Sequence, residues 1–403
     1  MSDDARRLVP TAVSALLETL ERAGHTACAL GTCVTELARG RSPAAYELGT
    51  SASFETLLAL FPRGVVTAPQ QLCVASAAGP LDLHSFRDAD GVAGELAHRD
   101  FTLHALALRR DGVLLDPHGG LADLASAVLR APGDADARFA EDPLRALRAA
   151  RLVAELGFEL ESGTEKAAAR VAEQVVAQRP ARVRAELALL LLAPHVEAGL
   201  RTLRRLGLEA ALAPGVAADA PALVARLPRD LELRLAAWLL EARAISTLRG
   251  LRYPRTRVQR VERLLQLHPI DAGPAQAREQ RVRRLARRSP PDLEGLVALR
   301  EAEIALRGEG DAAACRVAPL RAALERTQRA DRLADARASL AIGGEDVMRR
   351  LGVGPGHHVG RALNHLALCV AEDPSRNRRD VLLALLDAFA ASNGAEAPHG
   401  EVS

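Results

Sequence analysis

Carboxylates and arginines at short spacing are the residues of this sequence that can do chemistry. The segment EDPLR (141–145) places a carboxylate and a guanidinium three residues apart at the start of a helical pattern. Residues at this spacing share a helix face, so Asp142 and Arg145 are predicted side by side near a helix N-terminus. Together they can present the hydrogen-bond donors and acceptors that a pyrimidine or adenine ring requires. A helix cap with a local ion pair is the alternative.

Two further segments carry groups that suit a nucleotide. In HRDFT (98–102), Arg99 can pair with phosphate and Asp100 can accept hydrogen bonds from ribose hydroxyls, although an ion pair that braces a turn is the alternative. GTCV (31–34) lies between a predicted strand and a predicted helix, where a turn can hold phosphate on backbone N–H groups. One glycine alone does not establish such a turn.

A small sheet with flanking helices is predicted to position these groups in the first 140 residues. Residues 13–22 and 34–39 have helical periodicity, and short strands are predicted at 27–30, 71–75, 81–85, 103–108 and 113–116. From Asp142 onward the pattern is helical almost throughout, with the apolar run 187–192 predicted to be buried. The fold class is therefore α+β.

Composition and charge narrow the class of protein without identifying it. The chain has 403 residues, enough for two to four domains, and its 53 basic residues nearly balance 51 acidic ones. Its five scattered cysteines form no C-x-x-C pair, which indicates neither a zinc site nor a disulfide framework and favours the cytoplasm. Without a long apolar run, neither secretion nor a membrane span is predicted.

Local charge is more informative than the net charge. Arginines recur at 249, 252, 255, 257, 260 and 263, and again at 278, 281, 283, 284, 287 and 288. Such runs either form a solvated helix face or contact nucleic acid.

Taken in order, these segments resemble the class II tRNA nucleotidyltransferases (CCA-adding enzymes) and the bacterial poly(A) polymerases. The family's motifs are G-G-x-V-R-D, D-x-D, a third carboxylate before T-F-R, R-R-D-F-T-x-N-A, D-P-x-G-G and E-D-P-x-R-x-L-R-x-x-R. The closest counterparts here are HRDFTLHALAL (98–108), DPHGGLADL (116–124) and EDPLRALRAARLVAELGF (141–158). RPARVRAEL (179–187) resembles the neck motif E-R-I-x-x-E-L, and similarity continues to about residue 388.

The resemblance implies a polymerase-β-like nucleotidyltransferase head followed by all-helical neck, body and tail domains. We expect the head at 1–140, the neck with nucleotide-reading helices at 141–193, the body at 194–275 and the tRNA-binding tail at 276–390. Residues 391–403 are expected to be a disordered C-terminus. The implied partners are tRNA or another RNA 3′ end and CTP or ATP, with no DNA and no membrane. The two arginine runs would lie in the body and tail, where the family holds tRNA.

Site residues follow from the family's motifs. Base reading is assigned to Asp142 and Arg145, and ribose or phosphate contacts are assigned to Arg99 and Asp100. The remaining nucleotide-binding residues implied are Gly31, Thr32, Arg148 and Arg151, of which the two arginines face the triphosphate.

The carboxylates that would hold Mg²⁺ depart from the family pattern. Ala45 stands at the first Asp of D-x-D, Glu47 at the second, and Asp82 at the third carboxylate, so the catalytic and metal-binding set is reduced to Glu47 and Asp82. Two-metal transfer needs carboxylates that bridge both ions. Thr32 also replaces a glycine, and Thr35 and Glu36 replace the Arg-Asp pair of the phosphate turn.

Three interpretations remain open from the sequence. The first is a protein that binds tRNA 3′ ends and nucleotides, with catalysis weak or lost. The second is an active CCA-adding or poly(A)-adding enzyme with rearranged metal ligands, including Glu36. The third is a non-catalytic scaffold or regulatory protein. The sequence does not separate CCA addition from poly(A) addition.

Overall fold

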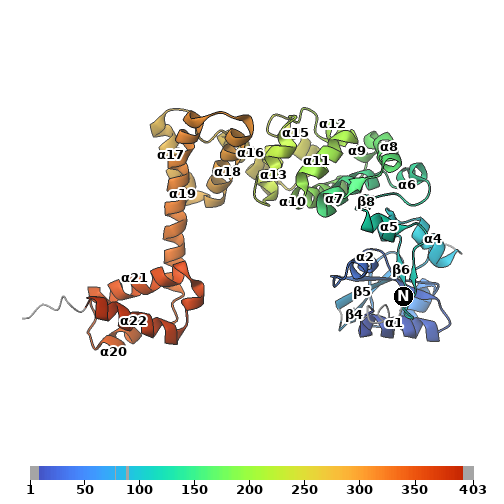
Figure 1. Cartoon of the computed structure of the whole chain (residues 1–403), viewed down its shortest axis with the longest axis horizontal. Coiled ribbons are helices and arrows are strands. Elements are labelled where there is room, and N and C mark those ends of the chain that lie inside the picture. The colour runs from blue at the N-terminus through green and yellow to red at the C-terminus, as the bar shows by residue number, and fades with distance from the viewer. Residues whose placement is uncertain (1–8, 78, 88–89, 394–403) are drawn as a thin grey trace, which may run out of the picture. The chain divides into compact units, whose positions relative to one another are not determined.

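The computed structural model describes residues 9–77, 79–87 and 90–393, and the chain divides into two compact units at Gln266/Leu267 (Figure 1). The boundaries expected at 140/141 and 193/194 lie inside the first unit. The boundary expected at 275/276 lies at the start of α17 (Ala275–Arg288) in the second unit. The division into head, neck, body and tail therefore stays a prediction.

The first unit begins with a mixed sheet of strand order β3-β4-β5-β2-β1-β6-β7. Of these neighbours, β2 and β5 run parallel and the other pairs run antiparallel. The predicted strands at 27–30, 71–75, 81–85 and 113–116 are present. β2 and β3 were not predicted, because their residues show no clear periodicity. The strands are β1 (Ala27–Leu30), β2 (Tyr46–Thr50), β3 (Val65–Ala68), β4 (Gln71–Ser76), β5 (Gly79–Ser85), β6 (Ala107–Leu108) and β7 (Leu114–Leu115).

The predicted strand at 103–108 is wrong in its first half. Thr102–His104 form a 3₁₀ turn, η2, and only Ala107–Leu108 pair with β1. The Thr102 hydroxyl donates a hydrogen bond to Asp123 (2.7 Å), and the Thr102 amide donates to the carbonyl of Arg130 (2.8 Å). These bonds hold the backbone out of the sheet, a tertiary effect that local alternation does not reveal.

The two faces of β2 and β5 differ in chemistry. Leu48 and Leu83 pack in the core with α1 (Thr11–Arg22), and successive strand residues point to opposite faces. Glu47 and Asp82 are directly opposed in the parallel register, so both lie on the face away from α1. The sheet thus presents its carboxylates together on one side.

Helices make up most of the rest of the first unit. Residues 187–192 end α10, and Leu187 is buried as predicted, but Leu189 is 50% exposed. A two-residue strand, β9 (Glu159–Leu160), pairs with β8 (Val128–Leu129) within this helical part. The helices are α2 (Thr32–Ala38), α3 (Phe54–Leu60), α4 (Gly91–Ala97), α5 (Gly120–Ala125), α6 (Ala135–Glu141), α7 (Leu144–Leu156), α8 (Ser162–Arg170), α9 (Ala172–Val176), α10 (Pro180–Leu192), α11 (Val196–Arg205), α12 (Leu208–Leu212), α13 (Ala220–Ala225), α14 (Leu231–Trp238), α15 (Ala244–Gly250) and α16 (Arg255–Leu267).

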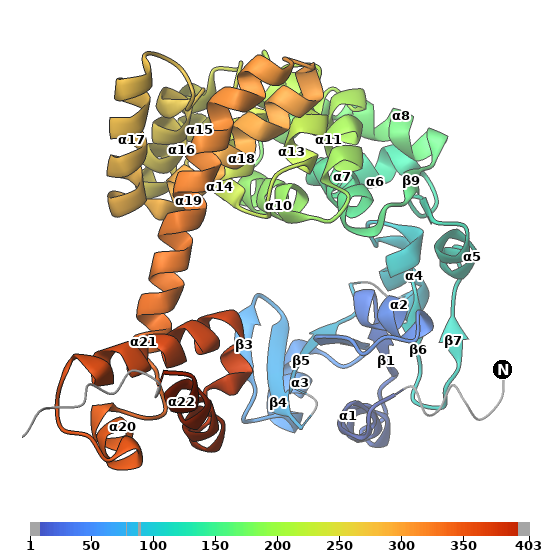
Figure 2. The ribbon, with the colours of Figure 1, turned by 60° about the vertical axis from the view of Figure 1, so that its left-hand side comes forward.

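The second unit is helical throughout its described residues. In Figure 2 the long α19 (Asp311–Ala338) runs from α17 and α18 (Pro290–Arg307) to a cluster of three helices. That cluster comprises α20 (Gly344–Leu351), α21 (His357–Glu372) and α22 (Arg379–Asn393), with the 3₁₀ turn η3 (Pro374–Arg376). The expected disorder of 391–403 is wrong for 391–393, which belong to α22, and 394–403 lie outside the described residues. No helix formed by the described residues has the length and apolar content to span a bilayer.

A buried ionic network holds the first helices of the second unit together. Arg300 of α18 donates hydrogen bonds to Asp271 (2.8 Å), Glu303 (2.8 Å) and Glu309 (2.6 Å). Its side chain is only 7% exposed, and those of Asp271 and Glu303 are equally buried. Such a network requires its shared cation, because buried carboxylates are costly when unpaired.

Replacing Arg300 with methionine should therefore destabilise the second unit by about 3–5 kcal/mol. Amide hydrogen exchange in α18 should accelerate by about two orders of magnitude or more, since about 1.4 kcal/mol corresponds to a factor of ten. The matched control is Arg283→Met on α17, where an exposed Arg283–Glu279 pair should contribute less than about 1 kcal/mol. Unchanged exchange in Arg300→Met would show that the network is dispensable.

Candidate functional site

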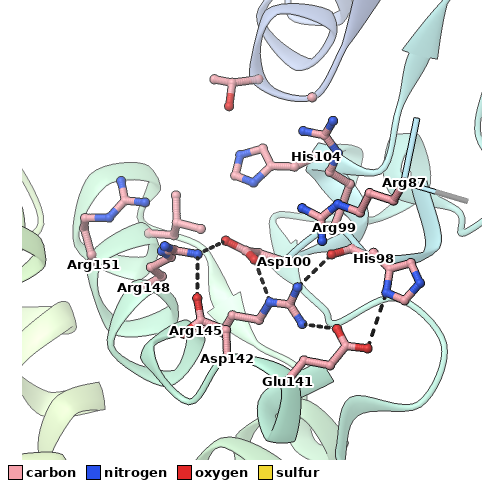
Figure 3. A pocket seen from close by; sticks show the side chains of 13 residues that line it. Arg87, His98, Arg99, Asp100, His104, Glu141, Asp142, Arg145, Arg148 and Arg151 are labelled. Carbon is pink, nitrogen blue, oxygen red and sulfur yellow. Dashed lines mark hydrogen bonds and ion pairs between the residues drawn. The ribbon is translucent and has the colours of Figure 1, made fainter. Parts of the chain in front are cut away.

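A cavity of about 720 Å³ lies in the first unit, where the loop after α4 meets the start of α7. Figure 3 shows its charged side chains converging from these two segments. Every residue predicted to bind nucleotide lines it, although the role of each stays a prediction, and the carboxylates Glu47 and Asp82 do not. The lining residues are Gly31, Thr32, Arg87, His98, Arg99, Asp100, His104, Glu141, Asp142, Arg145, Arg148, Arg151 and Leu152.

Arg145 is the most heavily bonded side chain of the cavity wall. Its Nε donates to Asp100 (2.6 Å), its Nη1 to Glu141 (3.0 Å) and its Nη2 to the carbonyl of His98 (2.7 Å). Nη1 also donates to the carbonyl of Arg138 (2.5 Å), and the residue is 5% exposed. Since these bonds use most of its N–H groups, Arg145 fixes the loop at 98–100 against α7.

Asp142 lies outside the helix that carries Arg145, so the prediction that the two share a helix face is wrong. Its backbone is extended (φ −142°, ψ 93°), because the residue before a proline is disfavoured in the helical conformation. α7 therefore begins after Pro143. The carboxylate of Asp142 accepts hydrogen bonds from the amide of Leu144 (3.3 Å) and from Arg182 of α10 (2.8 Å).

Asp100 joins the loop to two arginines of α7. One carboxylate oxygen accepts from Arg145 and the other from Arg148 Nη1 (2.7 Å). Burial raises the pKa of Asp100, but the charges of Arg148 and Arg145 outweigh burial and hold that pKa below its usual range. An anionic acceptor therefore persists at physiological pH, already paired on both oxygens.

Arg148 and Arg151 are anchored at one edge and open at another. Both donate through Nε to Glu186 of α10, at 3.1 and 2.6 Å, and Arg151 also pairs with Glu155 (2.8 Å). Among the described residues, nothing accepts a hydrogen bond from the Nη2 group of either arginine. These groups can bind an anion entering the cavity without breaking the existing pairs.

The turn between β1 and α2 forms the opposite wall. Gly31 has φ +68°, and a Cβ there would lie 3.1 Å from both Arg99 Nη1 and Glu47 Oε2. Glycine is therefore required by the backbone angle and by the close approach of this ion pair. Thr32 follows at the start of α2 and is exposed to the cavity, so its extra methyl and hydroxyl occupy space beside the turn.

The carboxylate face does not fit the Mg²⁺ ions that the resemblance implies. Ala45, just before β2, supplies no oxygen, and the carboxylate of Glu47 lies 2.9 Å from the guanidinium of Arg99. Asp82 of β5 lies beside Glu47, and the thiol of Cys73 lies next to Asp82. Burial raises the pKa of the Cys73 thiol, and the negative charge of Asp82 raises it further. Within the described residues, no three His, Cys, Asp or Glu side chains are arranged to hold a metal.

The predictions did not include several residues of this site. His104 lines the cavity and stands where the family motif R-R-D-F-T-x-N-A has asparagine. Arg182 and Glu186 match the arginine and last glutamate of the neck motif E-R-I-x-x-E-L. Matching those motifs position by position would have found all three, and also Arg87, since Ser85-Phe86-Arg87 stands where the family has T-F-R after the third carboxylate.

Comparison with known proteins agrees with this geometry. Residues 157–219 match a family described as the probable RNA and SrmB-binding site of polymerase A. The CCA-adding enzyme of Lactiplantibacillus plantarum is 34% identical over 206 residues, which cover 47% of this chain and 51% of that protein. The crystal structure of the Bacillus stearothermophilus CCA-adding enzyme in complex with CTP aligns with a TM-score of 0.62 and 25% identity, covering 96% of this chain and 98% of that one. These comparisons support the family that the sequence predicted, the class II CCA-adding enzymes and poly(A) polymerases.

The share of each chain that is matched differs between the sequence comparison and the structure comparison. The sequence match spans about half the length of this curated relative. The structural match spans almost all of both chains, and the Thermotoga maritima CCA-adding enzyme complexed with tRNA shares the fold at a TM-score of 0.61 and 16% identity. The predicted family and the α+β fold with a mixed head and helical remainder are thereby confirmed.

The members of the two arginine runs differ in whether they pair within the chain. In the first, Arg257 pairs with Glu232 (2.5 Å) and Arg260 with Asp230 (2.6 Å), so both brace α16 against α14. Arg249, Arg252 and Arg255 remain exposed. In the second, three members cap carbonyls or pair with a neighbouring carboxylate: Arg278, Arg281 and Arg283.

His104 should be uncharged near neutral pH. Burial lowers its pKa from 6.5 to about 4, although the charge of Asp100 partly opposes this effect. Because the unfolded imidazole binds a proton more readily, acidification from pH 6.5 to 4 should favour unfolding through this residue. In a nitrogen-15 NMR titration, the His104 imidazole should therefore stay neutral at pH 5.5. A His104 pKa above 6 would contradict the buried environment.

Proposed function

We propose that this chain binds CTP or ATP together with the 3′ end of tRNA or another RNA, and that its nucleotide transfer is weak or lost. Family membership supports the ligands, since the relatives compared above include CCA-adding enzymes and one was solved with CTP. The observation that carries the proposal is a contrast inside one site. The arginine–aspartate wall is fully assembled, whereas the carboxylate face lacks an oxygen at Ala45.

The arginine wall supports nucleotide binding. Arg148 and Arg151 keep open donor groups on the cavity side and are held from behind by Glu186. A guanidinium fixed in this way loses little conformational entropy when it binds phosphate. Asp100 pairs with Arg145 of α7, and Asp142 pairs with Arg182 of α10, so both aspartates are also held in place.

Weak catalysis is supported by the state of the carboxylate face. Metal ions stabilise transition-state charge by several kcal/mol, and each 1.36 kcal/mol is a factor of ten in rate. With Ala45 in place of a carboxylate and Glu47 bonded to Arg99, a loss on the order of a thousandfold or more is expected.

One observation favours the alternative of an active enzyme with rearranged ligands. Glu47 and Asp82 are opposed in register on one face of the sheet, as a shared metal would require. Glu36 does not complete the set, because its carboxylate pairs with Arg39 (3.1 Å) and Arg41 (3.8 Å). A transfer assay separates the two functions.

The assay uses tRNA lacking its 3′ CCA, labelled CTP or ATP, and Mg²⁺ or Mn²⁺. The natural chain should extend the RNA at less than about a thousandth of the rate of an active family member. The double variant Ala45→Asp, Glu47→Asp restores the family's carboxylate pair and should raise any residual rate. Efficient extension by the natural chain, abolished by Asp82→Ala, would overturn the proposal and establish the alternative.

Nucleotide binding is tested separately with Arg148→Ala. Loss of a charge-assisted hydrogen bond to phosphate costs about 1.5–3 kcal/mol, so the Kd for CTP or ATP should rise about ten- to a hundredfold. The matched control is Arg201→Ala on α11, where an exposed Arg201–Glu197 pair should leave the Kd unchanged. Thermal melting of both variants controls for folding. Equal Kd values in the two variants would exclude Arg148 from the nucleotide site.

A further inference from the structure

Arg99 lies at the centre of the carboxylate face and is bonded to two of its members. Its Nη1 donates to Glu47 of β2 (2.9 Å), and its Nη2 donates to Glu95 of α4 (3.0 Å). Glu95 is 2% exposed, and the Arg99 side chain is 15% exposed. The guanidinium therefore links the sheet to α4 from a largely buried position.

The surrounding groups extend this contact into an ionic cluster. His84 of β5 lies 3.7 Å from Glu47 and 3.5 Å from Glu95, and Arg87 lies 3.8 Å from the second oxygen of Glu95. Arg99 and Arg87 supply two positive charges to Glu47 and Glu95, and Asp82 lies beside Glu47 as a third carboxylate. Glu47 and Glu95 therefore already have cationic partners within the chain.

This cluster forms part of the cavity wall. Arg99 and Arg87 line the cavity, and the Arg99–Glu47 pair lies directly against the turn at Gly31. A triphosphate held by Arg148 and Arg151 on the other side would face this wall. Without Arg99, Glu47 and Glu95 would repel it; with Arg99 in place, they do not.

We propose that Arg99 is a built-in cation that replaces the divalent metal at this site, so that the triphosphate of CTP or ATP binds without metal. The inference rests on the nucleotide binding proposed above and goes beyond it by assigning the source of the compensating charge. It also accounts for the poor fit of Mg²⁺, because the oxygens of Glu47 that a metal would use are already bonded to a guanidinium. Arginine is permanently protonated, so this compensation is constant over the physiological pH range.

The test measures CTP and ATP binding to the full chain by calorimetry, once in excess EDTA and once in millimolar MgCl₂. The two Kd values should agree within about threefold, a difference of less than about 1 kcal/mol. Binding that requires Mg²⁺ by more than about tenfold would overturn the inference and leave the proposed function intact. Absence of binding in both buffers would overturn the proposed function and the inference with it.

Two variants examine the role of Arg99 directly. Arg99→Ala should lose more than about tenfold in affinity in EDTA and recover in MgCl₂, because an external cation can then occupy the vacated place. Glu47→Gln retains the shape of the side chain and keeps the site foldable should Arg99→Ala unfold. Its affinity in EDTA should equal or exceed that of the natural chain, since one negative charge is removed from the wall. Weaker binding by Glu47→Gln, or no Mg²⁺ rescue in a folded Arg99→Ala variant, would contradict the assignment.

Discussion

The ionic contact between Asp100 and α7 is the interaction on which the cavity depends. Asp100 follows α4 in the sheet-containing part of the chain, and Arg145 and Arg148 belong to the helix that begins the helical part. Arg148 also reaches Glu186 of α10, so three segments far apart in the sequence meet at Asp100 and its partners. A site built this way keeps its shape only while the buried Arg145 satisfies its acceptors, since an unpaired buried charge is costly. The cavity is therefore a property of tertiary structure, assembled from residues that short motifs already contain.

The sequence was informative wherever local pattern decides structure. The strand at 27–30 and the helical periodicity after Asp142 were predicted because a short apolar run and helix spacing are local signals. η2 was missed, since Thr102 leaves the sheet for a hydrogen bond to Asp123, a residue 21 positions away. The membership of the cavity was likewise predictable from ordered motifs, but the partners of its charges were not. Asp142 pairs with Arg182, and Arg99 pairs with Glu47. Ion pairs between separate elements depend on distances in the folded chain, which the spacing of residues in the sequence does not give.

Arginine makes internal pairs at many places in this chain, so its density along the sequence alone does not identify an RNA-binding surface. With nearly equal numbers of basic and acidic residues, many guanidinium groups act as internal counterions or cap carbonyls. Arg234, which is 4% exposed, donates to the carbonyls of Pro228 and Leu227, and Arg300 joins three carboxylates. Scarce aromatic residues limit other ways of filling and fastening the interior, and the planar five-donor guanidinium suits such buried junctions. Exposure and pairing, more than sequence density, separate arginines that bind a partner from those that hold the fold.

The length of the side chain at position 47 has an evolutionary consequence. Glutamate reaches Arg99, whereas aspartate at the same place is one methylene shorter and would leave Arg99 with Glu95 alone. Positions 47, 95 and 99 should thus covary among homologous chains, with glutamate at 47 accompanying the Arg99–Glu95 pair. The Arg99–Glu47 pair also makes the order of mutations matter, which is a form of epistasis. An aspartate introduced at position 45 should have little effect while Glu47 remains bonded to Arg99.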